Sequence, residues 1–183
     1  LLLFWFLIAI TISKAQELPD GFVYLSDIDA SIKAELRYLS SNNFIGKPID
    51  GYHKNCVIVT KQTAITLHNI QRELLKKALS LKIFDAYRPQ YYPNVSKSEL
   101  FKRGYIASKS GHTRGSTVDL TIINIKTGKE LDMGSPYDYF GTVSHPFHKN
   151  ISKKQKENRM LLRKKMLANN FKPYENEWWH FTL

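Results

Sequence analysis

The segment 117–123 constrains the fold more than any other part of the chain, because its residues alternate in character. An extended strand there points Val118, Leu120 and Ile122 to one face and Thr117, Asp119 and Thr121 to the other. This alternation is typical of a strand that packs one face on a hydrophobic core. We therefore expect Asp119 on the polar face of a sheet strand.

Helical patterns lie on both sides of this strand in the sequence. We expect one helix over 60–80, with Thr60 as its N-cap, and another over 153–168, because apolar residues recur at helical spacing in both segments. Further strands are expected over 81–87 and 176–182. Short strands interleaved with two long helices predict a single α+β domain with a mostly antiparallel central sheet flanked by helices.

The first residues of the chain are apolar. Residues 1–13 carry no charge, and they are too few for a membrane span of about 20 residues. Ser13-Lys14-Ala15 then places small residues where a signal peptidase cleaves. We expect residues 1–15 to be a signal peptide lacking its N-terminal part, followed by a mature domain over 16–183 without stable membrane insertion. We therefore expect the protein to be exported, with the periplasm as its location. The alternative is that residues 1–15 stay attached as an uncleaved membrane anchor.

Charge and cysteine content narrow the class of protein. The formal net charge is +11, and much of the excess lies in 153–166. Apolar residues recur at helical spacing between those charges, which indicates the solvated face of an amphipathic helix rather than a nucleic-acid site. We therefore expect no nucleic-acid partner. Cys56 is the only cysteine, so no intrachain disulfide can form.

A histidine and a carboxylate lie seven residues apart at the start of the 117–123 strand. His112 and Asp119 are separated by a glycine-bounded turn, which is weak evidence for a metal site by itself. The sequence EWWH at 177–180 adds His180 as a third ligand. Two histidines and one aspartate leave an open position on a tetrahedral zinc ion, which is typical of a catalytic site. We expect one Zn²⁺ per chain, held by His112, Asp119 and His180.

Glu177 is the expected general base for such a site. A zinc ion makes water nucleophilic at neutral pH, and a nearby carboxylate must take the proton. Residues three apart on a flat strand face opposite ways, so Glu177 and His180 would diverge. The strand is therefore bulged near Glu177, or Glu177 lies in the turn before it. Glu175 is the alternative base, and Trp178 and Trp179 are expected to pack beside the metal.

Three motifs in combination resemble the zinc D,D-peptidases: SGHTRGSTVD at 110–119, EWWH at 177–180 and DAYRP at 85–89. Within that group the chain is most similar to the D-alanyl-D-alanine dipeptidases of the VanX type. The further segments that carry this likeness are LRY (36–38), NNF (42–44), GKPIDGY (46–52) and MGSPYD (133–138). The resemblance covers 29–183 and implies a zinc metallopeptidase with the fold that this group shares with hedgehog-type domains.

The resemblance also implies residue roles. His112, Asp119 and His180 match the family's zinc ligands, and Glu177 matches its catalytic base. Arg88 matches the arginine that stabilises the tetrahedral oxyanion, a role that suits a fixed positive charge.

Two further residues match substrate contacts of the family. Asp138 would hold the ammonium group of the substrate, and Ser110 would help to bind its terminal carboxylate. Structural alternatives stay open for these positions. Arg88 is alternatively a surface partner of Asp85, Asp138 a turn residue after Pro136, and Ser110 the start of the Gly111 turn.

The reaction that the resemblance implies is hydrolysis of the small dipeptide D-alanyl-D-alanine to two D-alanines, in cell-wall peptide turnover or D-alanine salvage. The alternative is a zinc D,D-carboxypeptidase that trims terminal D-alanine from peptidoglycan precursors. That branch usually shows EPWH where this chain has EWWH, which favours the dipeptidase. A noncatalytic zinc-stabilised binding module is the third reading. Glu177 and Arg88 argue against it, because a structural zinc ion needs neither. No oligomeric state is predicted.

Overall fold

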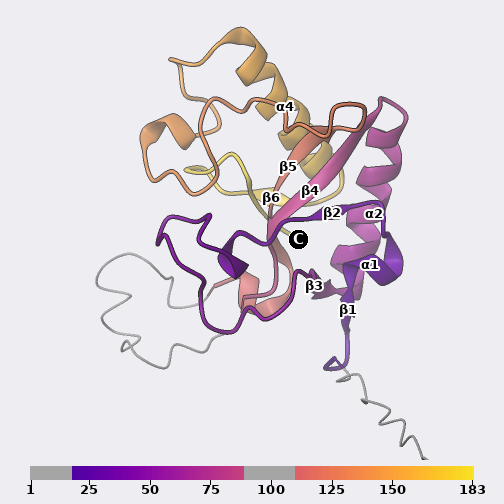
Figure 1. Ribbon diagram of the computed structural model, residues 1–183. Coiled ribbons are helices and arrows are strands. Elements are labelled where there is room, and N and C mark those ends of the chain that lie inside the picture. The colour runs from indigo at the N-terminus through magenta and orange to yellow at the C-terminus, as the bar shows by residue number, and fades with distance from the viewer. Residues whose placement is uncertain (1–17, 89–109) are drawn as a thin grey trace, which may run out of the picture.

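A five-stranded sheet forms the centre of the protein, whose computed structural model describes residues 18–88 and 110–183 (Figure 1). Its strands, in spatial order, are β2 (Lys33–Ala34), β4 (Leu79–Asp85), β5 (Thr117–Asn124), β7 (His180–Thr182) and β6 (Lys172–Pro173). Only β2 and β4 are parallel; the other neighbours are antiparallel. The expected mostly antiparallel sheet is therefore confirmed, with one parallel pair at an edge.

The remaining elements surround this sheet. A separate two-stranded sheet pairs β1 (Phe22–Tyr24) with β3 (Ile58–Thr60). The helices are α1 (Leu25–Ile28), α2 (Lys61–Leu75) and α4 (Lys153–Ala168), with short 3₁₀ helices η1 (Arg37–Leu39), η2 (His112–Arg114) and η3 (Thr142–Ser144). An ion pair between Lys165 of α4 and Glu73 of α2 joins the two long helices. The single α+β domain predicted from the sequence is confirmed.

Helix α2 begins as predicted but ends earlier. The Thr60 hydroxyl accepts a hydrogen bond from the Thr63 N–H, which caps the helix. Leu67, Ile70 and Leu74 are fully buried along its inner face. The predicted end near residue 80 is wrong, because Ala78 adopts a left-handed conformation (φ 54°) that turns the chain into β4.

Helix α4 has the bounds that the sequence predicts. Ser152 and Gln155 form a capping box at its start. Leu162 and Met166 are fully buried, whereas most of its charged residues lie on the exposed side. The basic segment therefore forms the solvated face of an amphipathic helix, as its spacing indicates.

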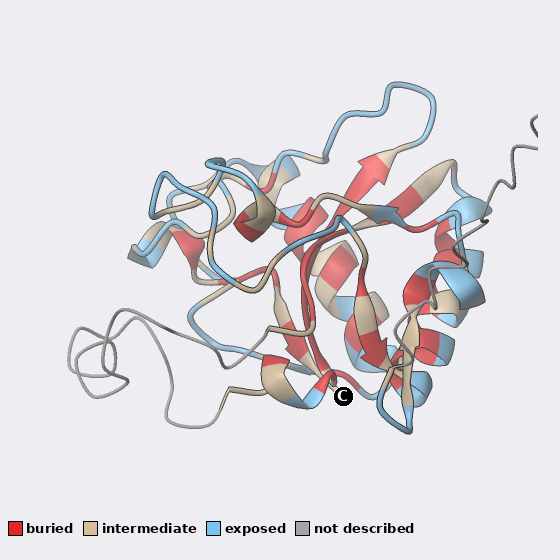
Figure 2. Cartoon of the chain, turned by 60° about the horizontal axis from the view of Figure 1, so that its bottom comes forward, coloured by how far each residue is buried: buried red, intermediate tan, exposed pale blue. Residues whose placement is uncertain are grey.

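The strand predictions are partly wrong at their ends. Strand β4 begins and ends two residues before the predicted 81–87. The predicted strand over 176–182 is a strand only from His180, because Glu175 and Asn176 form a turn. Strand β5 is buried along both faces (Figure 2), so its polar residues lie inside the protein rather than in solvent.

Some of the residues on which the sequence predictions rest lie outside the described part of the chain. The expected signal peptide (1–15) and Pro89 of the DAYRP motif lie outside the described residues. Among the helices that the structure does describe, none has both the length and the apolar character to cross a bilayer.

Candidate metal centre and active site

The site is built on one rung of the central sheet. Asp119 of β5 lies directly opposite Asp85 of β4 on one side and His180 of β7 on the other. Side chains of directly opposite residues share a face of the sheet. A bulge between Ile83 and Asp85 creates this arrangement, because regular pairing would place Phe84 opposite Asp119. The bulge therefore brings a second carboxylate to the site.

The short helix η2 carries His112 over the start of β5. Two glycines make this turn possible: a Cβ on Gly111 would lie 2.0 Å from Thr117 Oγ1, and Gly115 adopts a left-handed φ of 69°. The His112 Nδ1 lies 2.8 Å from the Ala86 carbonyl oxygen, to which it donates its proton. This hydrogen bond fixes the ring and leaves the Nε2 lone pair free for a metal.

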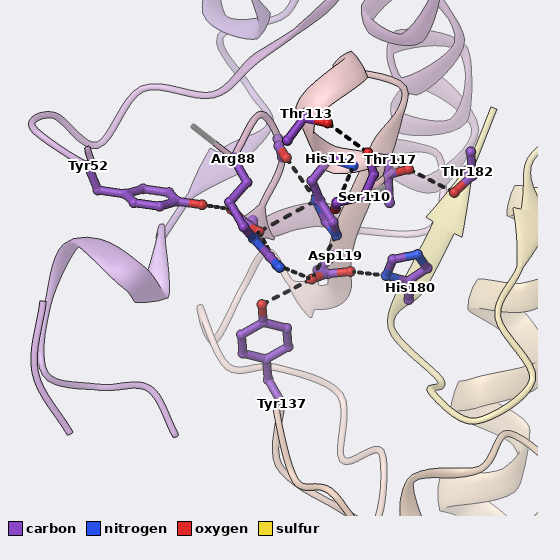
Figure 3. A network of polar contacts seen from close by, with 12 residues as sticks. Tyr52, Arg88, Ser110, His112, Thr113, Thr117, Asp119, Tyr137, His180 and Thr182 are labelled. Atoms are coloured by element: carbon purple, nitrogen blue, oxygen red, sulfur yellow. Dashed lines mark hydrogen bonds and ion pairs between the residues drawn. The ribbon is translucent and has the colours of Figure 1, made fainter. Parts of the chain in front are cut away.

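His112, Asp119 and His180 converge as predicted, with one potential ligand atom from each lying within 4.8 Å of the others (Figure 3). His180 Nδ1 lies 2.9 Å from Asp119 Oδ1, and His112 Nε2 lies 3.5 Å from Asp119 Oδ2. Asp119 Oδ1 is buried without a hydrogen-bond partner of suitable geometry in the described parts of the chain. A buried carboxylate oxygen facing an imidazole nitrogen fits a bound cation, so the donor set suits a metal ion.

The charges of this cluster support the same conclusion. Burial alone would raise the pKa of Asp119, but the imidazoles of His112 and His180 outweigh it and hold that pKa well below its usual value. Burial alone would lower the pKa of His180, but Asp119 raises it above its usual value. The site therefore stabilises a negative carboxylate and attracts positive charge, which a proton or a metal can supply.

Glu177 lies in the turn that leads into β7, so the expected bend before the last strand is confirmed. Its Oε2 is 3.7 Å from His180 Nδ1. Burial, with a further contribution from the negative charge of Asp119, raises the pKa of Glu177 to about 6. A carboxylate with this pKa can accept and release a proton near neutral pH. Glu175, the alternative base, is exposed.

Arg88 enters the site from the chain that follows β4. Its Nε and Nη2 donate to Asp85 Oδ2 at 2.9 and 2.6 Å, and its Cζ lies 4.9 Å from the centre of the Tyr38 ring. The expected pair with Asp85 is therefore present. The reading as a surface arginine is wrong, because the side chain is only 20% exposed and its Nη2 lies 3.8 Å from Asp119 Oδ2.

Asp138 and Ser110 lie at the edges of this cluster. Asp138 has a left-handed φ of 59°, and its Oδ2 is buried with no hydrogen-bond partner among the residues described. Burial, reinforced by the charge of Asp119, raises the pKa of Asp138 to about 7. The Ser110 hydroxyl accepts the His112 N–H at 3.3 Å, so it helps to form the Gly111 turn. The substrate roles of both residues stay predictions.

Three tyrosines whose roles the sequence did not predict complete the site. The Tyr137 hydroxyl donates to Asp119 Oδ2 at 3.0 Å, and the Tyr52 hydroxyl donates to Asp85 Oδ1 at 2.6 Å (Figure 3). The Tyr38 ring lies under Arg88. Tyr38, Tyr52 and Tyr137 belong to motifs quoted above, but no local spacing shows that their hydroxyls reach the site. Trp178 and Trp179 are buried, as expected of packing residues.

Known proteins are similar to this sequence over most of its length. The family model of Peptidase M15, described as D-ala-D-ala dipeptidase, matches residues 19–94 and 90–183. A D-alanyl-D-alanine dipeptidase of Enterococcus faecalis is 35% identical, with 91% of this chain and 93% of that protein covered. Proteins of the same name from Streptomyces coelicolor and Escherichia coli are 34% and 31% identical, covering 88% and 93% of this chain and 91% and 86% of their own lengths. The chain therefore belongs to the D-ala-D-ala dipeptidase family, a group of metal-dependent peptidases, and is a hydrolase.

Proposed function

We propose that the protein is a zinc-dependent dipeptidase that hydrolyses D-alanyl-D-alanine to two D-alanines. The observation that carries this proposal is the convergence of His112, Asp119 and His180 beside the proton acceptor Glu177, in a chain of the D-ala-D-ala dipeptidase family. Imidazole and carboxylate groups are common zinc ligands, and three of them leave a coordination position for chemistry. One zinc ion per chain is expected.

Each group around the ligands has a task in peptide hydrolysis. A bound zinc ion would supply a nucleophilic water at neutral pH and would polarise the scissile carbonyl. Glu177 takes a proton from the attacking water and passes it to the leaving amine, a role that suits a half-buried carboxylate 3.7 Å from His180 Nδ1. The Arg88 guanidinium, oriented by Asp85, stabilises the negative charge that develops on the carbonyl oxygen.

Two residues suit the ends of a free dipeptide. The unpartnered Oδ2 of Asp138 is a suitable acceptor for the ammonium group of the substrate. The Ser110 hydroxyl accepts the His112 N–H and keeps its own proton, which it can donate to a terminal carboxylate. A substrate with both charged ends close together would use both contacts.

Turnover of free and blocked dipeptides tests this proposal. Zinc-loaded protein should release D-alanine from D-alanyl-D-alanine, should act poorly on its N-acylated form and on L-alanyl-L-alanine, and should lose activity when zinc is chelated. Preference for the N-acylated substrate would instead identify a D,D-carboxypeptidase, because that reaction needs no free ammonium group. Full activity without any metal would contradict the zinc site.

A further inference from the structure

Tyr137 contacts a proposed metal ligand, yet the proposed mechanism gives it no task. It lies in the segment between β5 and η3, next to Asp138. Its ring packs against Phe84, with centroids 4.7 Å apart, and makes an edge contact with Trp179 at 5.4 Å. Both neighbours are buried at 1% exposure or less. The ring is thus held between core residues, and this packing fixes where its hydroxyl points.

The hydroxyl of Tyr137 distinguishes the two oxygens of Asp119. It donates to Oδ2 at 3.0 Å, whereas Oδ1 faces His180 Nδ1 and lacks a hydrogen-bond partner in the segments that the structure describes. We propose that Tyr137 is a positioning residue for Asp119: its phenol occupies Oδ2 and so presents Oδ1 to the metal. Groups that bond to ligating carboxylates commonly set their orientation in this way.

A competing donor explains why this contact matters. Arg88 Nη2 lies 3.8 Å from the same oxygen, Asp119 Oδ2. Without the phenol, this guanidinium is the nearest permanently charged group able to pair with Asp119. Such a pair would turn the carboxylate away from the metal and would draw Arg88 from Asp85. The neutral phenol satisfies Oδ2 without adding a positive charge that would repel a metal ion.

The second carboxylate of the site provides a matched control. Tyr52 donates to Asp85 Oδ1 as Tyr137 donates to Asp119 Oδ2, and both contacts are phenol to buried carboxylate. Asp85, however, pairs with Arg88 and is not among the three clustered ligands. Asp85 also lies 3.5 Å from His112 Nδ1, so removing the Tyr52 hydroxyl should weaken zinc binding less than removing the Tyr137 hydroxyl, which bonds directly to a ligand. Tyr139, which is 51% exposed, offers the same chemical change on the same segment as Tyr137.

Zinc affinity of the variants Y137F, Y52F and Y139F tests the inference, which rests on the proposed zinc site. Competition with a chromogenic chelator gives the dissociation constant, and circular dichroism verifies the fold. Y137F should bind zinc about 10- to 100-fold more weakly than the unaltered protein, the usual cost of losing a group that orients a ligand. Y139F should keep the affinity of the unaltered protein, and Y52F should lose less affinity than Y137F.

The outcomes separate this inference from the proposed function. If the unaltered protein binds no zinc, the metal site and the role of Tyr137 both fail. If Y137F is folded and binds zinc as tightly as the unaltered protein, only the role of Tyr137 fails. Equal losses in Y137F and Y139F would also overturn it, because they would indicate a general effect on the segment.

A measurement on the unaltered protein covers the case in which Y137F does not fold. With carbon-13 at tyrosine Cζ, zinc binding should shift a tyrosine resonance, since the metal withdraws charge from the carboxylate that the Tyr137 phenol contacts. Absence of any shift in the tyrosine resonances on zinc loading would overturn the inference.

Discussion

The two sides of the site are built in different ways. On the strand side, Asp119 and His180 are direct neighbours on β5 and β7, and His112 precedes β5 by one tight turn. On the loop side, Tyr52 and Asp138 come from connecting segments: Tyr52 donates to Asp85, and Asp138 makes a side-chain hydrogen bond with Tyr38. Backbone ladders therefore fix the strand side, and individual hydrogen bonds fix the loop side.

This contrast leads to different expected effects of mutation. Arg159 of α4 is 1% exposed and holds the segment that runs from β5 past η3, because it donates to the carbonyls of Met133, Val143 and His145 at 2.5 to 2.8 Å. Changes on the strand side should alter metal binding or turnover, whereas changes on the loop side should alter substrate binding.

The largest effect is expected on the strand side, in the variant Glu177→Gln. Glutamine keeps the size of the side chain but cannot accept the proton, so kcat should fall about 10²- to 10⁴-fold. Zinc stoichiometry should stay at one per chain, and KM should change little. Glu175→Gln is the matched control, because Glu175 lies in the same turn and is exposed. Steady-state kinetics and metal analysis measure both; a loss of turnover in Glu175→Gln alone would transfer the role to Glu175.

The strand side was also the part that the sequence predicts best. The spacing from His112 to Asp119, the alternation of β5 and the EWWH motif each encode local geometry, and the three ligands meet as these patterns imply. Even the turn at Glu177 follows from the conflict between its spacing to His180 and a flat strand. The positions of the three ligands and of Glu177 could be predicted because they depend on short-range backbone geometry.

The loop side was predicted less completely, because its contacts join distant segments. Tyr137 bonds to Asp119 across 18 positions, and Tyr52 bonds to Asp85 across 33 positions. The bulge that turns Asp85 toward the site was not predicted, although the alternation of β4 breaks where Phe84 follows Ile83. Only tertiary packing determines these positions. The family resemblance pointed to Asp138, but its left-handed backbone became evident in the structure.

A smaller but broader effect is expected on the loop side, in Arg159→Met. Methionine fills part of the volume but leaves one buried and two part-buried carbonyls without this donor, and an unpaired buried carbonyl costs about 1–3 kcal/mol. The free energy of unfolding should fall by about 3 kcal/mol. KM should rise more than kcat falls, since the freed loop carries Asp138.

The neighbouring Arg163→Met provides the control for this change. Arg163 lies on the same helix, one turn further on, and its guanidinium lies over the Phe147 ring at 4.9 Å from the centroid. Arg163→Met should lower the free energy of unfolding by no more than about 1 kcal/mol and leave KM unchanged. Urea denaturation and steady-state kinetics measure both variants. If Arg159→Met loses stability but keeps KM, the loop does not position the substrate.

The smallest expected effect concerns the protonation of Asp138. In the metal-free protein, burial and the charge of Asp119 raise the pKa of Asp138 to about 7. Only the ionised form can pair with the ammonium group of the substrate, so affinity should weaken as pH falls through this pKa, by about tenfold per unit at the steepest. The ammonium group, with a usual pKa of about 7.7 to 8.0, stays charged below neutral pH. Below neutral pH, the pH dependence of binding therefore reflects protonation of the protein and not of the substrate.

Binding is measured without turnover in the zinc-loaded Glu177→Gln variant, by calorimetry over a range of pH. Because a cation on Asp119 offsets part of the negative charge that raises the pKa of Asp138, the midpoint in this protein should lie below 7. Adding Asp138→Asn should weaken binding and abolish the pH dependence. Binding that stays constant with pH in the parent variant would mean that Asp138 does not hold the ammonium group. The loop side would then recognise the dipeptide through neutral contacts alone.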